Sequence, residues 1–184
     1  MIFIASARKL ISPISIITFL VPIIALVIVV LIRSFVLLDY VHVLTGGMWT
    51  GIDLFMGIVM SRVLRSLDPR ARADVIKRLT PIMLLFMPSL AAVATTAGVY
   101  LAMDLGIFRL SNPLIVTAGI IVLILIIQGF GIIMPNEVRI FLEVSKPNPD
   151  INKIVKLGMR NIYVSGSQSI FQITIILVMA FIAI

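Results

Sequence analysis

Residues 39–53 read DYVHVLTGGMWTGID, and they place a histidine and two aspartates inside one long apolar stretch. At about 100° per residue, the polar and small side chains of this stretch and its continuation share roughly one third of a helix circumference. They are Asp39, His42, Gly46, Trp49, Thr50, Asp53, Gly57 and Met60. Ionisable groups are costly at membrane depth and usually mark function, so we expect this face to point at protein and not at lipid.

The composition of the whole chain indicates an integral membrane protein. Hydrophobic residues make up 61% of the 184 residues, charged residues make up 12%, and the mean hydropathy is +1.22. A water-soluble domain of this length cannot bury so much apolar surface. A bilayer core about 30 Å thick needs roughly 20 apolar residues per helix. We therefore predict an all-α bundle in a single membrane domain, 1–184, with five spans near 13–33, 36–61, 81–103, 113–134 and 162–184.

The basic residues predict the orientation of the bundle. All of them except Arg33 and Arg109 precede the first span, follow the second or separate the last two. The positive-inside rule then puts the N-terminus in the cytoplasm and the C-terminus outside, in the plasma membrane. Basic residues at span ends are also typical of contact with lipid headgroups, which argues against nucleic acid as the partner of a chain with net charge +7.

Local signals predict where helices begin. Within the predicted cytoplasmic loop of about 62–80, Asp68 and Pro69 introduce residues 68–80 as a short amphipathic helix on the membrane surface. Thr80 before Pro81, and Asn112 before Pro113, each place a capping side chain before a proline, so we expect two spans to start there.

The later spans also carry polar faces. Ser89, Thr96 and Tyr100 share a face of the third span, and Thr117 and Gln128 share a face of the fourth. In the fifth span, the face consists of Asn161, Ser165, Gln168 and Gln172. Lipid offers these groups no hydrogen-bonding partner, so the sequence predicts a bundle with a polar interior.

His42 is the first candidate for chemistry. A neutral imidazole ligates haem iron or copper, and Met60, Met87 or Met103 offers a soft thioether as a further ligand. The alternative is a structural hydrogen bond from His42 to Thr96 or Tyr100.

Asp53 is the second candidate. A carboxylate inside the bundle either carries protons or is held neutral by amides such as those of Gln128 and Gln168. On a neighbouring face, Gly47 and Gly51 form a GxxxG pattern, which predicts close packing of another helix.

The spacing of His42, Trp49 and Gly51, H-x6-W-x-G, resembles the first core helix of the copper resistance protein D superfamily, which includes the membrane protoporphyrinogen oxidase HemJ. Residues 96–100, TAGVY, resemble the end of the next helix of that group. The resemblance covers about 36–184 and implies a four-helix core, with the first span as an addition. It also implies haem or copper at the position of His42. HemJ proteins carry a functional lysine near a later helix, and no predicted span of this chain contains one.

We therefore expect an intramembrane polar site that handles haem b or copper by binding, transport or redox chemistry. One alternative is a small proton-coupled permease or channel that uses Asp53. Another is a non-catalytic subunit of a larger membrane complex, or a homo-oligomer. The sequence contains no hydrolase motif and no phosphate-binding glycine loop, which argues against a soluble type of enzyme.

Overall fold

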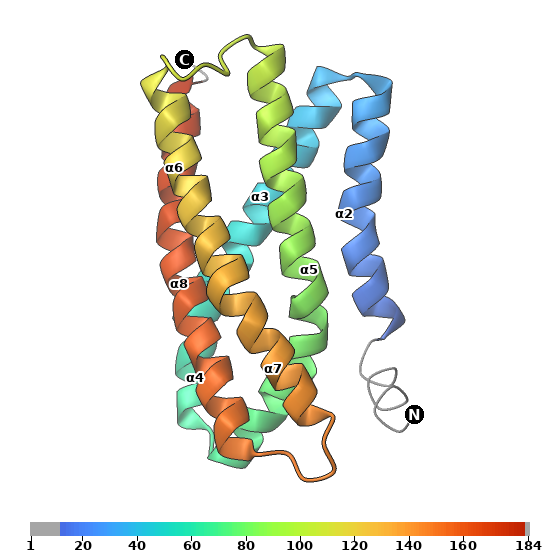
Figure 1. Ribbon diagram of the computed structural model, residues 1–184, viewed down its shortest axis with the longest axis vertical. Helices are drawn as coiled ribbons and strands as arrows, with labels where there is room; N and C mark the ends of the chain where they lie inside the picture. The colour runs from blue at the N-terminus through green and yellow to red at the C-terminus, as the bar shows by residue number, and fades with distance from the viewer. Residues whose placement is uncertain (1–11, 183–184) are drawn as a thin grey trace.

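The computed structural model describes residues 12–182, and every regular element in this range is helical (Figure 1). The α-helices are α2 (Pro13–Ile32), α3 (Phe35–Leu54), α4 (Ser61–Ser66), α5 (Pro69–Asp104), α6 (Pro113–Gln128), α7 (Met134–Val144) and α8 (Ile151–Ile182). Two π-helical segments, η1 (Phe55–Met60) and η2 (Gly129–Ile133), join α3 to α4 and α6 to α7 without a break. The result is five long apolar helical rods, which confirms the predicted all-α, five-span class.

The helix starts agree with the sequence at Pro113 but not at Pro81. The Asn112 side chain accepts a hydrogen bond from the Leu114 amide at 3.0 Å, as predicted for a cap. In contrast, α5 starts at Pro69, where Asp68 caps it, and continues through a buried Pro81 to Asp104. The separate surface helix predicted within residues 62–80 is therefore wrong. Its apolar side, with Ala73 and Ile76 buried, packs into the core, and the helix continues through the proline.

The helix α2 lies at the edge of the bundle, beside α3 and α5 (Figure 1). An apolar cluster fills the space between these three helices: Val29, Leu38, Val41, Val93, Ala97 and Leu101. The remaining rods form the predicted four-helix core, in which α8 contacts α3, α5, α6 and α7. The first span is thus an addition to a core made by the other four.

The turns that carry the basic residues lie at one end of the bundle, which we call the basic end (Figure 1). Here the turn between α7 and α8 is closed by Glu143, whose carboxylate accepts from Lys146 at 2.8 Å and from Lys153 at 2.6 Å. The Arg72 side chain donates to the carbonyls of Leu64 and Leu67 at 2.7 and 2.8 Å. These contacts fix the ends of the helices that enclose the interior.

Candidate functional site

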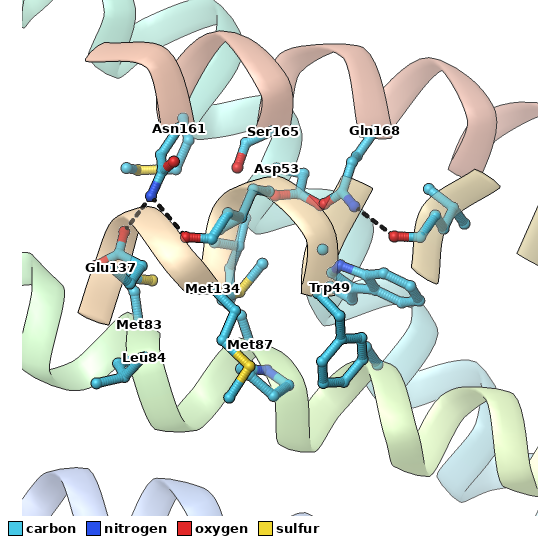
Figure 2. Close-up of a pocket in the computed structure, with 18 of the residues that line it drawn as sticks. Trp49, Asp53, Met83, Leu84, Met87, Met134, Glu137, Asn161, Ser165 and Gln168 are labelled. Carbon is cyan, nitrogen blue, oxygen red and sulfur yellow. Dashed lines mark hydrogen bonds between the residues drawn. The ribbon is translucent and has the colours of Figure 1, made fainter. Parts of the chain in front are cut away.

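A cavity of about 240 Å³ lies inside the four-helix core (Figure 2). Its walls come from α3 and η1, α5, the rod made by α6, η2 and α7, and α8. Most of the wall is apolar. The polar side chains that line it are Trp49, Asp53, Thr80, Thr95, Thr96, Glu137, Asn161, Ser165 and Gln168.

Asp53 is the fully buried carboxylate of this cavity. It has no exposed surface, and α3 directs it toward α8. Gln172 Nε2 donates a hydrogen bond to Asp53 Oδ2 at 2.9 Å, whereas Asp53 Oδ1 is buried without a hydrogen-bonding partner. The predicted amide partners were Gln128 and Gln168, so the sequence found the kind of partner but not the residue.

Glu137 is a second carboxylate at the same cavity, and the sequence reasoning missed it. Asn161 Nδ2 donates to Glu137 Oε1 at 2.9 Å and also contacts the carbonyl of Ile133 at 3.2 Å (Figure 2). Asn136 Nδ2 in turn donates to Asn161 Oδ1 at 2.8 Å. Glu137 Oε2 remains buried and unpartnered. The predicted fourth span ended at 134, because the apolar run ends there, whereas the helix continues to Val144.

The polar face of α8 connects the two carboxylates. Asn161 bonds Glu137, Gln172 bonds Asp53, and Ser165 and Gln168 line the cavity between them. Gln168 Nε2 donates to the carbonyl of Leu125 at 3.0 Å, which ties α8 to α6 (Figure 2). From Asn161 to Gln172 this face extends about 16 Å along the helix axis.

No basic side chain in the described residues pairs with the two carboxyl groups of the cavity. Within residues 12–182, neither Asp53 nor Glu137 forms an ion pair, and the wall contains no Lys, Arg or His. A bare carboxylate charge costs several kcal/mol to bury. Each carboxyl group therefore holds a proton or is paired with a cation that the chain itself does not supply.

The other predicted members of the polar interior fall into three groups. Trp49 and Thr96 line the cavity. Ser89 is buried elsewhere and donates to the carbonyl of Phe19 at 2.7 Å, which ties α5 to α2. Thr117 of α6 and Tyr100 of α5 are exposed on the bundle surface, so the polar faces predicted for these two helices do not point inward at these positions.

Gln128 lies between α6 and α8, away from Asp53. Its Nε2 donates to Ser167 Oγ at 3.3 Å, and its Oε1 is buried without a partner. The predicted contact between the Gln128 amide and Asp53 is therefore not formed.

His42 lies outside the cavity wall, between α3 and α5. Its Nδ1 is 2.8 Å from the carbonyl oxygen of Ala94, and its ring packs on Gly98. A carbonyl oxygen only accepts, so Nδ1 carries a proton, and in the neutral imidazole Nε2 then has none. The predicted partners Thr96 and Tyr100 do not make this bond.

The methionines differ in whether they line the cavity. Met56, Met83, Met87 and Met134 line the cavity, whereas Met103 is exposed. Across residues 12–182, no group of three His, Asp or Glu side chains is placed to hold a metal ion.

Close helix packing occurs at other glycines than predicted. In the described part of the chain, a Cβ at Gly47 or Gly51 meets no atom within 4 Å, so the GxxxG pattern packs against nothing there. A Cβ on Gly57 instead meets the backbone of Gly166, where η1 crosses α8. This crossing holds the rod that carries Asp53 against α8.

Comparison with known protein families, curated proteins and solved structures finds no match to this chain. The resemblance to the copper resistance protein D superfamily stays a prediction from the sequence. What is established is a polytopic helical bundle suited to a membrane, with buried polar residues around an internal cavity.

Proposed function

We propose that this protein is a small proton-coupled permease in which Asp53 and Glu137 exchange protons. The observation that carries the proposal is the buried, unpartnered oxygen on each of the two carboxyl groups, at one cavity without a basic side chain. Acidic groups inside membrane helices are used as proton relays in pumps and transporters.

The polar face of α8 supports proton movement between the carboxyl groups. Ser165 and Gln168 line the cavity between the levels of Asn161 and Gln172. A cavity of about 240 Å³ with several polar groups has room for bridging water. Glu137 lies on the α7 side, toward the basic end, and we assign it to exchange with water there, with Asp53 as the deeper group.

The experiment uses purified protein in liposomes that hold an imposed pH gradient and a pH-sensitive dye. Organic cations, organic anions, sugars and amino acids are added in turn. At least one class is expected to dissipate the gradient, and the Asp53→Asn and Glu137→Gln variants are expected to lose this activity. Asp104→Asn, which removes an exposed carboxylate outside the cavity, is the matched control.

Two results contradict the permease. One is that no class accelerates the decay beyond the rate of protein-free liposomes. The other is that both cavity variants dissipate the gradient as fast as the wild type does.

A second candidate function, haem or copper handling, is favoured by the contact of His42. A ligating histidine usually donates its other ring N–H to a backbone carbonyl, and His42 Nδ1 has such a contact with Ala94. His42 Nε2 would then hold the iron of a haem, whereas copper would need further ligands that the described residues do not gather. Such a group supplies redox chemistry when it is bound.

An absorption spectrum and metal analysis of protein purified from haem- and copper-supplemented cells test this candidate. A Soret band or stoichiometric copper that disappears in His42→Ala supports it. Metal-free, colourless protein that retains gradient dissipation removes it in favour of the permease.

A further inference from the structure

The cavity opens sideways between α5 and the rod made by α6 and η2. Four of its lining residues are exposed at the bundle surface, and they lie on facing helices: Ala92 and Thr96 on α5, Ile126 and Phe130 on the other rod. Phe130 is 51% exposed and Ile126 44%. Both stand inside the apolar fourth span, so this mouth faces the hydrocarbon of the bilayer. A molecule dissolved in the membrane can therefore reach the cavity directly.

The cavity wall suits a positively charged ligand with an apolar body. Two aromatic rings line it, those of Trp49 and Phe130, and aromatic faces attract organic cations. Four methionines also line the cavity: Met56, Met83, Met87 and Met134. Their flexible thioether side chains adapt to guests of different shape, as they do at other promiscuous binding surfaces.

From these observations we propose that the substrate is a lipophilic organic cation, such as a quaternary or protonated amine with an apolar body, which enters from the bilayer and pairs with Asp53 and Glu137. The inference rests on the proposed permease function and names its substrate class. Asp53 is fully buried and its Oδ1 has no hydrogen-bonding partner, so it is the group that most needs a positive partner.

Binding of the cation replaces a proton. The O–H bond of one carboxyl group breaks, the proton leaves to water, and the single positive charge of the guest pairs with the carboxylate that remains. Of the titratable side chains in residues 12–182, Asp53 of α3 and Glu137 of α7 line the cavity, and η1, α5, α6, η2 and α8 add none to the wall. The net charge inside the bundle is thus the same before and after the exchange.

A pair of ligands with one shape and different charge tests the inference. Phenyltrimethylammonium is a permanent cation, and tert-butylbenzene is its neutral counterpart with carbon in place of nitrogen. Calorimetric titration of the detergent-purified full chain in weak buffer measures affinity, and a pH indicator measures released protons. The wild type is expected to bind the cation at least about tenfold more tightly than the neutral compound and to release about one proton per cation.

Variants locate the binding. Asp53→Asn is expected to lower the affinity for phenyltrimethylammonium by about tenfold or more and to leave the affinity for tert-butylbenzene unchanged. Glu137→Gln is a second variant of the same kind, which keeps the test valid if Asp53→Asn fails to fold. Elution of each variant as a single monodisperse peak shows that it is folded. Asp104→Asn is the control, because its carboxylate is exposed and distant from the wall.

The outcomes separate the two proposals. Equal affinity for both compounds, or binding of the cation without proton release, overturns the cation class even if another substrate dissipates the pH gradient. Tight binding of the cation with proton release, in a protein that dissipates no gradient, upholds the site and contradicts the permease.

Discussion

At the scale of single residues, the hydrogen bond between Asp53 and Gln172 joins the second span to the fifth. Gln172 is 1% exposed and Asp53 has no exposed surface, so this hydrogen bond is shielded from solvent. The sequence predicted that both side chains face the interior, since each lies on a polar helical face. It did not predict that they are partners, because the tilt of helices shifts the level at which side chains meet.

Removing the donor is expected to destabilise the fold. Gln172→Leu leaves a buried carboxyl group without its partner, which costs about 1–3 kcal/mol in the free energy of unfolding. The Asp53→Leu, Gln172→Leu double variant is expected to recover most of that loss, since two apolar side chains replace the pair, yet to lose gradient dissipation. Thermal unfolding followed by circular dichroism, with the liposome assay, measures both. A double variant that transports normally contradicts a functional role for Asp53.

The position of His42 depends on a glycine in α5. A Cβ on Gly98 comes within 2.8 Å of His42 Cε1, so Gly98→Ala is expected to displace the ring, break its contact with Ala94 and lower the free energy of unfolding by about 1–3 kcal/mol. Gly47→Ala is the matched control on α3, where open space and helix propensity predict equal or slightly higher stability. Equal melting temperatures for the two variants contradict this packing.

At the scale of elements, each cavity carboxylate stands next to a π-helical segment. Asp53 precedes η1, and Glu137 follows η2. A π-helix inserts extra residues into the helical repeat, so the 3.6-residue period loses its phase there. Periodicity identified the face around Trp49 and Asp53, which precedes η1, whereas Glu137 lies beyond the apolar run at which the predicted fourth span ended. The GxxxG pattern failed for another reason. The close approach is between Gly57 of η1 and Gly166 of α8, and two glycines on different helices form no spacing pattern within one helix.

The crossing of η1 and α8 is expected to be the least tolerant contact between elements. In Gly166→Ala, the new Cβ lies 3.0 Å from Gly57 Cα, and backbone cannot move aside as a flexible side chain does. We expect the free energy of unfolding to fall by about 1–3 kcal/mol, and we expect a lower yield of monodisperse protein. Gly51→Ala, on the same rod but in open space, is the control. Similar yield and melting temperature for both variants rule out this contact as a constraint.

At the scale of the whole molecule, composition and hydropathy were sufficient to predict five helical rods, and the Asp68 and Asn112 caps marked two of their starts. The length of α5 was not predictable from local signals, because burial of Ala73 and Ile76 overrides the helix-breaking tendency of Pro81. The cavity was also beyond the sequence, since it forms where four helices fail to fill the space between them.

The orientation can be measured with single cysteines, because the natural chain contains none. Ser66→Cys and Asn148→Cys place exposed thiols at the basic end, and Ser111→Cys places one at the opposite end. A membrane-impermeant maleimide applied to intact cells is expected to label only the cysteine at position 111, and to label all three after permeabilisation. The reverse pattern contradicts the predicted cytoplasmic location of the basic end.

The central claim is that two carboxyl groups without a basic partner face a cavity open to lipid, and a hydrophobic carbodiimide tests it most directly. Dicyclohexylcarbodiimide reaches carboxyl groups from the bilayer and reacts with the protonated form, and peptide mass spectrometry locates the adduct. We expect the adduct on Asp53 or Glu137, and we expect phenyltrimethylammonium to reduce it. Adducts confined to exposed acids such as Asp39 and Asp104, with Asp53 and Glu137 unmodified, would contradict the account.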